Sequence, residues 1–513
     1  MAIKRYFANA DNTLTNAFDE NLITRGTGSN MGASDILEAF VIHGQTSASI
    51  NAANAEQSRI MIQFPVDEIV TDILSGTVPS SSVEYRLRMF NAPHADTLPD
   101  KYNLKVIMVS GTSWDEGSGL DMDTYRDAGV SNWLSSSNGK VWPGLPRVDD
   151  GQTSNAGGSF FTGSDEGTIS ASYYFSGGFE DLDIDVTFAV DKWRRLAAGA
   201  DNYGFLIRHD DEVITGSSGS FYTKKFFSRT SDYFLNRPFL EARWDSARQD
   251  NRANLFTSSS LAPASYNMNT IYLYNSIRGQ LQAIPETTGT GQHVLVSFYS
   301  GTSDTPSAPT GSKLHIISAA GSDVLNITGG RLIENASDIT GVYSASFATT
   351  SALTTVHDVW HSGSVQYFTG SIGINTLAAT PLLYDDEYIS DITNLQNSYL
   401  KGQKPKLRLF VREKNWSPNI YTKANATVET KVIEAAYWRL YRVTDNREII
   451  PFGTSSYNFT KMSYDTSGNY FELDTSYLDP GYSYGVQLVY YLQGRYIEQP
   501  ETFKFRIDDT SIT

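Results

Sequence analysis

The sequence lacks cysteine and long apolar runs, and it has fewer basic than acidic residues. Without cysteine, a disulfide framework, a thiolate zinc site and a cysteine nucleophile are excluded. A membrane-spanning helix needs about 18 consecutive apolar residues, which the sequence nowhere contains, so we expect no membrane partner. Lys and Arg number 40 against 57 Asp and Glu, a formal net charge of -17. Because nucleic-acid binding needs clustered basic side chains, we expect no nucleic-acid partner.

The first residues, MAIKRYFANADNTLTNAFDENL, carry two basic side chains that no apolar core follows. This pattern predicts that the chain has no signal peptide. We therefore expect the protein to be made in, and released from, a cytoplasm without Sec-type export.

Composition favours a β protein with several domains. At 513 residues the chain exceeds one ordinary core, and about 150 residues per domain suggests about three domains. Hydrophobic residues make up 40% of the chain and aromatic residues 12%, mostly 30 Tyr and 26 Phe, which is enough to bury real cores. With plentiful Ser, Thr and Gly, these side chains are typical of short strands joined by polar turns. We expect an all-β fold.

Alternating hydrophobicity predicts strands in the first half of the chain. Residues 58–64 place Ile60, Ile62 and Phe64 on one face, and residues 82–90 alternate in the same way. We expect both segments to be half-buried antiparallel strands.

Two other segments of this half do not read as strands. Residues 183–200 predict a short helical segment, the only one expected here. The stretch 117–178 is rich in Gly, Ser and Asp and predicts extended loops. Trp133 and Trp142 are expected to anchor these loops.

The segment RPFLEARW, residues 237–244, predicts the last strand of the first domain. Leu240, Ala242 and Trp244 share one face, while the two charged side chains between them point the other way. Proline has no backbone donor and belongs at the start of a strand. The polar sequence that follows predicts a linker or a surface strap, and we place a domain boundary near residue 246.

The rest of the chain repeats the strand pattern at the spacing of two further sandwiches. Strands are expected within 270–281, 293–301, 313–318, 340–349, 364–374, 404–416, 434–453, 470–496 and 502–507. The predicted domains are a first β-sandwich at 1–245, a linker with an immunoglobulin-like sandwich at 246–375, and a fibronectin- or immunoglobulin-like sandwich at 376–513.

A possible metal motif, His357-Asp-Val-Trp-His361, is better explained as part of a strand. Two histidines four residues apart on a helix bind zinc, with an intervening Glu as general base. Here the acid is Asp358 and the surrounding residues predict a strand, on which positions i and i+4 lie about 13 Å apart. We expect no metal, and exposed histidines flanking a buried Trp360.

An acidic loop, WDEGSGLDMDTY, offers oxygen ligands of the kind that calcium prefers. These are Asp115, Glu116, Asp121 and Asp123. The EF-hand spacing fails because an aromatic and a basic residue stand where a ligand and a glycine are needed. We expect the acids to be solvated, with calcium binding as the open alternative.

We find no catalytic motif. In RGTGSNMG, residues 25–32, the spacing of Gly26, Gly28 and Gly32 is one residue too long for a dinucleotide fingerprint, and no long helix follows. Neither a nucleophile elbow nor a Walker sequence occurs. We therefore expect a non-enzyme with no catalytic, metal-binding or cofactor-binding residues and no cofactor. A glycan-degrading enzyme stays open as a third class, because paired carboxylates carry no local signature.

Seven segments of the first half occur in the order of a known module. They are SNMGASDIL, SRIMIQFPVDEI, EYRLRMFNA, SWDEG, DIDVTFAVDKW, NYGFLIR and FFSRTSDYFLNRPFLEARW. In these segments, residues 1–245 resemble the DNRLRE-type β-sandwich family, whose members close on an Arg-Pro and an alternating strand. The resemblance implies a jelly-roll module related to carbohydrate-binding modules on cell-surface and wall-associated proteins. The long loops of 117–178 depart from a minimal module.

The whole chain, from MAIKRYFANADNTLTNAF to VWHSGSVQYFTGSI, is similar to structural proteins of tailed phages of marine bacteria and cyanobacteria. That resemblance implies a non-enzymatic virion protein, assembled in the host cytoplasm as an appendage of the neck, tail or capsid surface. Its implied partners are other virion proteins and further copies of itself in a homo-oligomer. The alternative is a glycan-binding adhesin or receptor-binding fibre, which would recognise host surface polysaccharide through exposed aromatic side chains.

Overall fold

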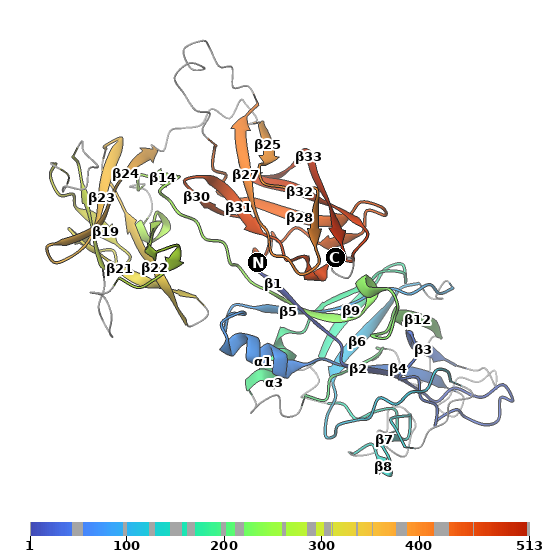
Figure 1. The fold of residues 1–513 in the computed structure, drawn as a ribbon. Coiled ribbons are helices and arrows are strands. Elements are labelled where there is room, and N and C mark those ends of the chain that lie inside the picture. Colours follow the sequence, from blue (N-terminus) through green and yellow to red (C-terminus); the bar gives the residue numbers. More distant parts are fainter. Residues whose placement is uncertain are drawn as a thin grey trace. The chain divides into compact units, whose positions relative to one another are not determined.

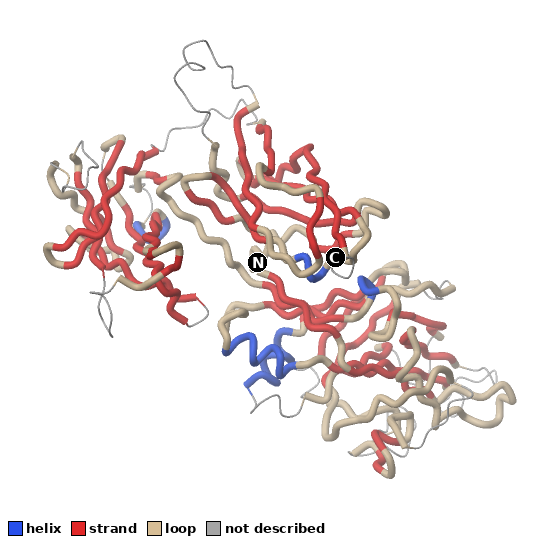
Figure 2. The backbone as a smooth tube through the Cα atoms, in the orientation of Figure 1, coloured by secondary structure: helices blue, strands red, loops and turns tan. Residues whose placement is uncertain are grey.

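The protein is described from a computed structural model and is mostly β. The structure describes residues 2–43, 55–95, 100–122, 129–143, 156–161, 170–195, 202–210, 220–258, 263–284, 294–301, 309, 311–334, 337–350, 352–375, 387–414, 430–454 and 456–509. One compact unit contains Ile3–Trp244, and a second contains Asp245–Thr513 with the first two residues. Strands dominate both units, as the sequence predicts (Figure 1, Figure 2).

The N-terminal unit, Ile3–Trp244, contains a four-stranded and a seven-stranded sheet. The first has the order β1-β13-β5-β10, and the second has the order β12-β3-β4-β11-β6-β9 with β2 also paired to β4. The strands are β1 (Ile3–Phe7), β2 (Ala10–Thr15), β3 (Ile36–Ile42), β4 (Glu56–Gln63), β5 (Glu84–Met89), β6 (Tyr102–Met108), β9 (Ser170–Phe175), β10 (Leu182–Asp185), β11 (Phe205–His209), β12 (Phe221–Phe227) and β13 (Phe239–Arg243). The first strand pairs with the last, so the unit closes on itself.

The closing strand β13 has the alternation that the sequence predicts, but both of its faces are buried. Leu240 and Ala242 are fully buried in the core. On the other face, Glu241 is fully buried between two guanidinium groups. Arg5 Nε lies 2.6 Å from Glu241 Oε2, and Arg243 Nε donates to Glu241 Oε1 at 2.7 Å. A ladder of paired charges therefore covers the face of the sheet opposite the core.

Two helices, α1 (Val66–Leu74) and α3 (Thr187–Arg195), pack against each other (Figure 1). Helix α3 lies in the predicted segment. The expectation of a single helix in this half is wrong, because α1 follows strand β4 directly. Its buried Val66 and Ile69 are three residues apart, the spacing of one helix face, and its first turn carries acidic side chains that favour the helix dipole.

The loop-rich stretch 117–178 contains regular structure that the sequence does not predict. Strand β9 pairs with β6, and a small hairpin joins β7 (Ser135–Ser137) to β8 (Lys140–Val141). The predicted anchors are confirmed, since Trp133 and Trp142 are both buried.

These tryptophans form a second core of the N-terminal unit. They pack with Trp114 against Met61 of β4 and Leu206 of β11. Strand β4 is therefore buried along its length except at its last residue, and the prediction that it is half-buried is wrong. Strand β5 does alternate between buried and half-buried side chains, as predicted.

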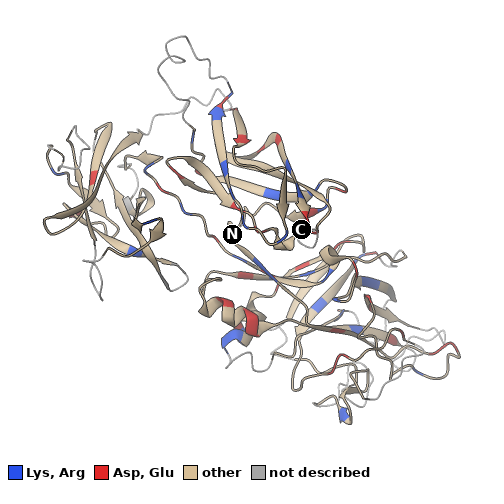
Figure 3. Cartoon of the chain, in the orientation of Figure 1, with Lys and Arg blue, Asp and Glu red and all other residues tan. Residues whose placement is uncertain are grey.

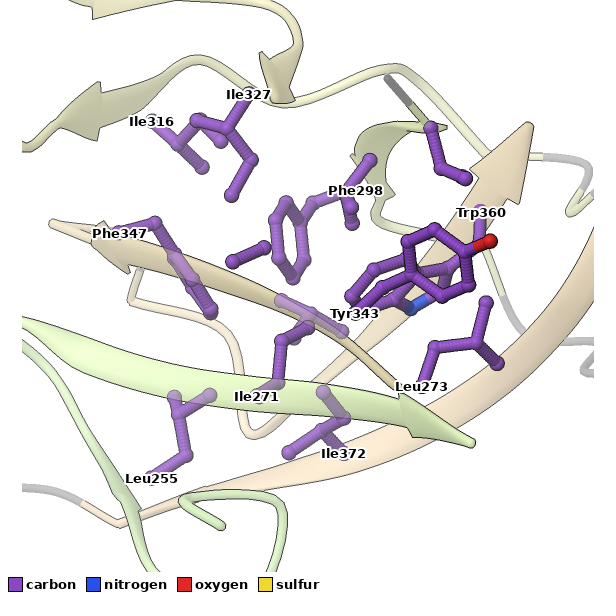
Figure 4. Packing of buried hydrophobic residues seen from close by; sticks show 14 of the residues in the cluster. Leu255, Ile271, Leu273, Phe298, Ile316, Ile327, Tyr343, Phe347, Trp360 and Ile372 are labelled. Carbon is purple, nitrogen blue, oxygen red and sulfur yellow. The ribbon is translucent and has the colours of Figure 1, made fainter. Parts of the chain in front are cut away.

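In the second unit, a first set of strands encloses one core. The order is β14-β24-β23-β18-β21-β22-β19-β20, with β15 also paired to β22. The strands are β14 (Leu255–Phe256), β15 (Asn269–Tyr274), β18 (Val294–Tyr299), β19 (Ile316–Ser318), β20 (Asp323–Val324), β21 (Ile327–Glu334), β22 (Ser337–Ala348), β23 (Thr355–Ser362) and β24 (Val365–Asn375). A small hairpin joins β16 (Ser276–Ile277) to β17 (Gln280–Leu281). Phe298, Tyr343 and Trp360 lie in this core (Figure 4).

The last part of the chain forms the C-terminal sandwich, with sheets ordered β25-β27-β31-β30 and β26-β33-β32-β28-β29. Its strands are β25 (Tyr388–Ile392), β26 (Ser398–Leu400), β27 (Lys406–Glu413), β28 (Ala436–Arg442), β29 (Glu448–Ile450), β30 (Ser463–Asp465), β31 (Gly468–Glu472), β32 (Ser483–Leu492) and β33 (Arg495–Asp508). Pro480 and Gly481 form a turn just before β32. After it, the Tyr484 hydroxyl donates to the Asp479 carbonyl at 2.9 Å, a tyrosine corner.

The segment that follows Trp244 is a strap, here defined as residues 245–256. The amide of Arg248 donates to Ser463 Oγ at 2.9 Å, which attaches the strap to the C-terminal sandwich. Three residues later, the amide of Asn251 donates to the carbonyl of Thr270 at 2.9 Å, in the preceding sandwich. Arg252 then binds the fully buried carboxylate of Asp358, with Nη1 at 2.9 Å from Oδ1. The strap therefore bonds to both sandwiches of the second unit.

We predict that Glu241→Gln lowers the free energy of unfolding of the N-terminal unit by about 3–5 kcal/mol at pH 7. The reason is that two buried guanidinium groups lose their carboxylate. Hydrogen exchange of peptides from this unit measures the effect separately from the other unit. Glu448→Gln, at an exposed position of β29, is the control and should cost less than about 1 kcal/mol.

The same substitution has a defined pH dependence. Burial raises the pKa of Glu241, but Arg5, Arg243 and Arg88 outweigh it and hold the pKa at about 2, below the usual 4.5. A depressed pKa stabilises the folded state above pH 4.5, and the stabilisation is lost as pH falls toward 2. The wild type and Glu241→Gln should therefore converge over this range. A stability difference that is the same at pH 7 and pH 2 would contradict the prediction.

We predict that Arg252→Met destabilises the second unit by about 3–5 kcal/mol, because it leaves the Asp358 carboxylate buried without its partner. Adding Asp358→Asn removes that charge and should restore part of the loss. Urea denaturation followed by hydrogen exchange of β23 peptides compares the two variants. If the double variant is no more stable than the single one, the ion pair does not account for the effect.

Candidate functional site

Tyrosine side chains gather on the outer face of the five-stranded sheet of the C-terminal sandwich. The turn between β32 and β33 is formed by Gln493 and Gly494, whose φ angles of 50° and 82° are both positive. Two central residues with positive φ form a type I′ turn, which matches the twist of the strands and sets their register. In that register Tyr491 lies directly opposite Tyr496, and their ring centroids are 4.8 Å apart.

A third tyrosine, Tyr437 of β28, completes this cluster. Its ring centroid lies 5.9 Å from that of Tyr496, and its hydroxyl donates to Asn458 Oδ1 at 3.3 Å. Tyr437 is buried, and burial is the main cause that raises its pKa to about 12. Tyr491 and Tyr496 remain 44% and 49% exposed. The cluster therefore consists of one buried tyrosine, Tyr437, packed against two tyrosines whose rings are accessible.

A cavity of about 460 Å³ opens beside these rings. Its lining includes Tyr388, Lys431, Glu434, Lys461 and Tyr491. We call this cavity together with the cluster of Tyr437, Tyr491 and Tyr496 the tyrosine groove. Its volume lies in the range of small-molecule sites, roughly 300–1,000 Å³.

The charges of the tyrosine groove differ in how they are satisfied. Lys431 Nζ lies 2.6 Å from Glu413 Oε1. Burial lowers the pKa of Lys431, but Glu413 and Tyr388 together outweigh burial and raise it. The side chains of Lys461 and Glu434 make no hydrogen bond or ion pair with other residues that the structure describes. One donor and one acceptor are thus available beside exposed aromatic rings, a combination that suits a ligand with both apolar and hydroxyl-bearing surfaces.

The sequence does not identify these residues. Exposed and buried tyrosines have the same local signature, because cores also take aromatic residues from alternating strands. A signal is present in LQGR, where Gln-Gly between two tyrosine-bearing strands indicates a tight hairpin. It predicts the pairing of Tyr491 with Tyr496, but not which face of the sheet is open.

The structure places His357-Asp-Val-Trp-His361 on strand β23, as predicted. Trp360 is buried, and its Nε1 donates to Asp358 Oδ2 at 2.8 Å. The expectation of exposed histidines is wrong for His357, which is only 4% exposed. Residues 356–360 of β23 are all buried, so both faces of the strand are covered there. His361 is half-buried, and a ring nitrogen lies 2.7 Å from Ser297 Oγ.

The acidic loop does not converge on one point. Asp115 and Asp121 are exposed, whereas Glu116 turns inward and makes a bidentate ion pair with Arg229. Asp123 lies outside the described residues. Within the part of the chain that is described, no group of three or more His, Cys, Asp or Glu could hold a metal ion.

The glycine loop at 25–32 is a structural element. A Cβ at Gly32 would lie 2.2 Å from the Glu116 carbonyl oxygen, so only glycine permits this approach. Beside it, Asn30 donates to the Glu116 carbonyl at 2.7 Å and accepts from the Gly119 amide at 2.8 Å. The loop thereby fixes the inward position of Glu116.

A buried carboxyl that sequence reasoning missed, Asp11, lies next to this loop. Its amide donates to Glu116 Oε1 at 2.8 Å, and its Oδ2 accepts from the Arg229 amide at 2.7 Å. Its Oδ1 is buried without a hydrogen-bond partner among the described residues. Burial is the main cause that raises the pKa of Asp11 to about 7, with a smaller contribution from Glu116, against the lowering effect of Arg229.

We predict that Asp11→Asn removes a decline in stability of the N-terminal unit between about pH 4 and 7. Over this range the folded state keeps a proton that the unfolded chain has lost, so wild-type stability falls as pH rises from the ordinary pKa of 3.8 toward 7. At pH 8 the variant should be more stable by roughly 2–4 kcal/mol.

Hydrogen exchange of β2 and β4 peptides at pH 5 and pH 8 tests this prediction. Asp232→Asn, at an exposed acid of the same unit, is the matched control and should keep the wild-type pH dependence. If Asp11→Asn and the wild type lose stability equally over this range, the buried carboxyl is not the cause.

No helix among the described residues is long and apolar enough to cross a membrane. No protein-family model matches the chain, and no curated protein matches it.

Solved structures give distant matches, among them structures of tandem domains. A chimeric titin Z1Z2 tandem matches 50% of this chain and 93% of its own, with 9% identity and a TM-score of 0.14. The FN1–FN3 domains of chicken CNTN1 match 59% of this chain and 86% of theirs, with 10% identity and a TM-score of 0.15. Salmonella alpha-2-macroglobulin reacted with methylamine matches 95% of this chain and 22% of its own, with 9% identity and a TM-score of 0.15. With TM-scores this low, the superpositions carry no argument about function.

Proposed function

We propose that this chain is a non-enzymatic structural protein of a tailed-phage particle. It forms an appendage of the neck, tail or capsid surface and acts in particle assembly or attachment. Its partners are other virion proteins and further copies of the same chain. The resemblance of the sequence to phage structural proteins supports the assignment to a phage particle. The structure of the two units supports the mechanical role.

The domain types are part of the proposal. The N-terminal unit is a jelly-roll sandwich, supported by its two antiparallel sheets and by the pairing of β1 with β13. The C-terminal sandwich is fibronectin- or immunoglobulin-like, supported by the tyrosine corner at Tyr484. The sandwich before it is immunoglobulin-like in size and strand spacing.

The strap carries the mechanical part of this proposal. A flexible linker would leave the sandwiches it joins free to move, whereas residues 245–256 bond to both in succession. A buried bidentate ion pair between Arg252 and Asp358 holds one end. A strap bonded to two sandwiches suits a protein that transmits load or spaces other components.

The charge distribution agrees with a role in assembly rather than nucleic-acid packaging. Lys and Arg are interspersed with Asp and Glu along the strands and loops (Figure 3). Many basic side chains form ion pairs, as Arg408 does with Asp465 at 2.7 Å. A phosphate-binding surface would instead need basic side chains free of acidic partners.

The second candidate is a glycan-binding adhesin or receptor-binding fibre. One observation favours it: the tyrosine groove offers two half-exposed rings beside a donor, Lys461, and an acceptor, Glu434, whose side chains have no partner among the described residues. The two candidates are compatible, because an attachment appendage of a particle can also bind the host surface.

We predict that the chain is present in several copies per particle of the phage that encodes it. Quantitative peptide mass spectrometry of gradient-purified, salt-washed particles measures the copy number against the major capsid protein. Gold-labelled antibody against the chain should then mark one location on the particle in electron micrographs. Absence of its peptides from infectious particles would refute the virion role, whatever the chain binds.

A further inference from the structure

We propose that the tyrosine groove binds a pyranose ring of a neutral polysaccharide. The inference deepens the glycan-binding candidate and rests on it. The contacts are assigned to the rings of Tyr491 and Tyr496, with Lys461 and Glu434 as the polar partners.

The shape of the tyrosine pair suits the apolar face of a sugar ring. Tyr491 and Tyr496 are tilted by 51° to each other, so they do not cover one another's faces. Each keeps nearly half of its surface exposed, so its ring is accessible to a ligand. The C–H groups of a pyranose face can pack on such a ring, as apolar groups do on aromatic surfaces generally.

The polar rim suits hydroxyl groups. Lys461 supplies a donor and Glu434 an acceptor, and neither side chain is engaged by another residue within the described chain. Adjacent hydroxyls on a sugar ring need both a donor and an acceptor. An apolar peptide would leave both charged groups without partners as it buried them, at a cost in binding free energy.

The charge balance of the groove favours a neutral ligand. Lys431 is neutralised by Glu413, and Lys461 is balanced by Glu434. A uronic acid would meet Glu434 with a charge of the same sign, while an amino sugar would meet Lys461 in the same way. An uncharged sugar ring is repelled by neither Glu434 nor Lys461.

The groove is also pre-formed. Its tyrosines stand on paired strands, and the positive-φ turn at Gln493–Gly494 fixes the register that brings them together. Tyr437 packs beneath and is tied by its hydroxyl to Asn458. A rigid aromatic surface loses little entropy when a ligand binds, which is necessary for a site that makes few contacts.

Affinity electrophoresis of the full chain in gels that contain a glucan, a galactan or a mannan tests the proposal. We expect at least one of these polymers to retard the protein. The double variant Tyr491→Ala/Tyr496→Ala should bind that polymer at least about tenfold more weakly, because it removes the central contact. Tyr491→Phe/Tyr496→Phe keeps the rings and should retain binding within about threefold.

Tyr482→Ala is the matched control, since Tyr482 is 41% exposed on the same sandwich and lies outside the groove lining. It should bind as the wild type does. Hydrogen exchange of β32 and β33 peptides confirms that each variant is folded.

Three results would overturn the inference. If none of the neutral polymers retards the protein, the groove does not bind a neutral polysaccharide. If only alginate, a uronic-acid polymer, retards it, the ligand is charged. Full binding by the double alanine variant moves glycan binding to another surface and leaves the glycan-binding candidate standing. None of these results bears on the particle experiment, so failure of this site and failure of the virion role are distinguishable.

Discussion

Buried pairs of arginine and carboxylate hold the joints of this protein, and the rest of its structure depends on them. Glu241 lies between Arg5 and Arg243 where the first and last strands of the N-terminal unit meet. Arg252 binds Asp358 where the strap enters a sandwich. With no cysteine in the chain, covalent closure is not available at these places. Breaking one such pair costs more than its formation gains, because the remaining charge stays buried.

Charge pairing also decides which side chains are available to a ligand. Glu116 turns inward, where it accepts from the Asp11 amide and pairs with Arg229, so it is not available to join the buried Asp11 in a metal site. In the C-terminal sandwich, Lys431 is held by Glu413. The side chains of Lys461 and Glu434 have no such partner within the described chain, and they line the cavity beside Tyr491.

Local pattern was sufficient for most strands because alternation reports the side of a strand that meets a core. Strand β5 follows it closely, with half-buried and buried side chains in alternation. Pattern failed where a second layer covers the other face. The tryptophan core over β4 buries side chains that alternation assigns to solvent, and His357 on β23 is buried in the same way. Helix α1 was missed because it begins at Val66, with only two residues between it and the end of strand β4 at Gln63.

The sequence by itself determined the β class, the closing strand at 239–243, the type I′ hairpin signal in LQGR and the absence of any thiol chemistry. These follow from local residue type, which decides backbone preference and face alternation. Only the tertiary structure decided that Glu241 is buried, that Glu116 serves Arg229 rather than a metal, and that Tyr491 and Tyr496 remain open. Burial and charge pairing depend on residues far apart in the chain, and a local sequence pattern does not predict which distant side chains will be in contact.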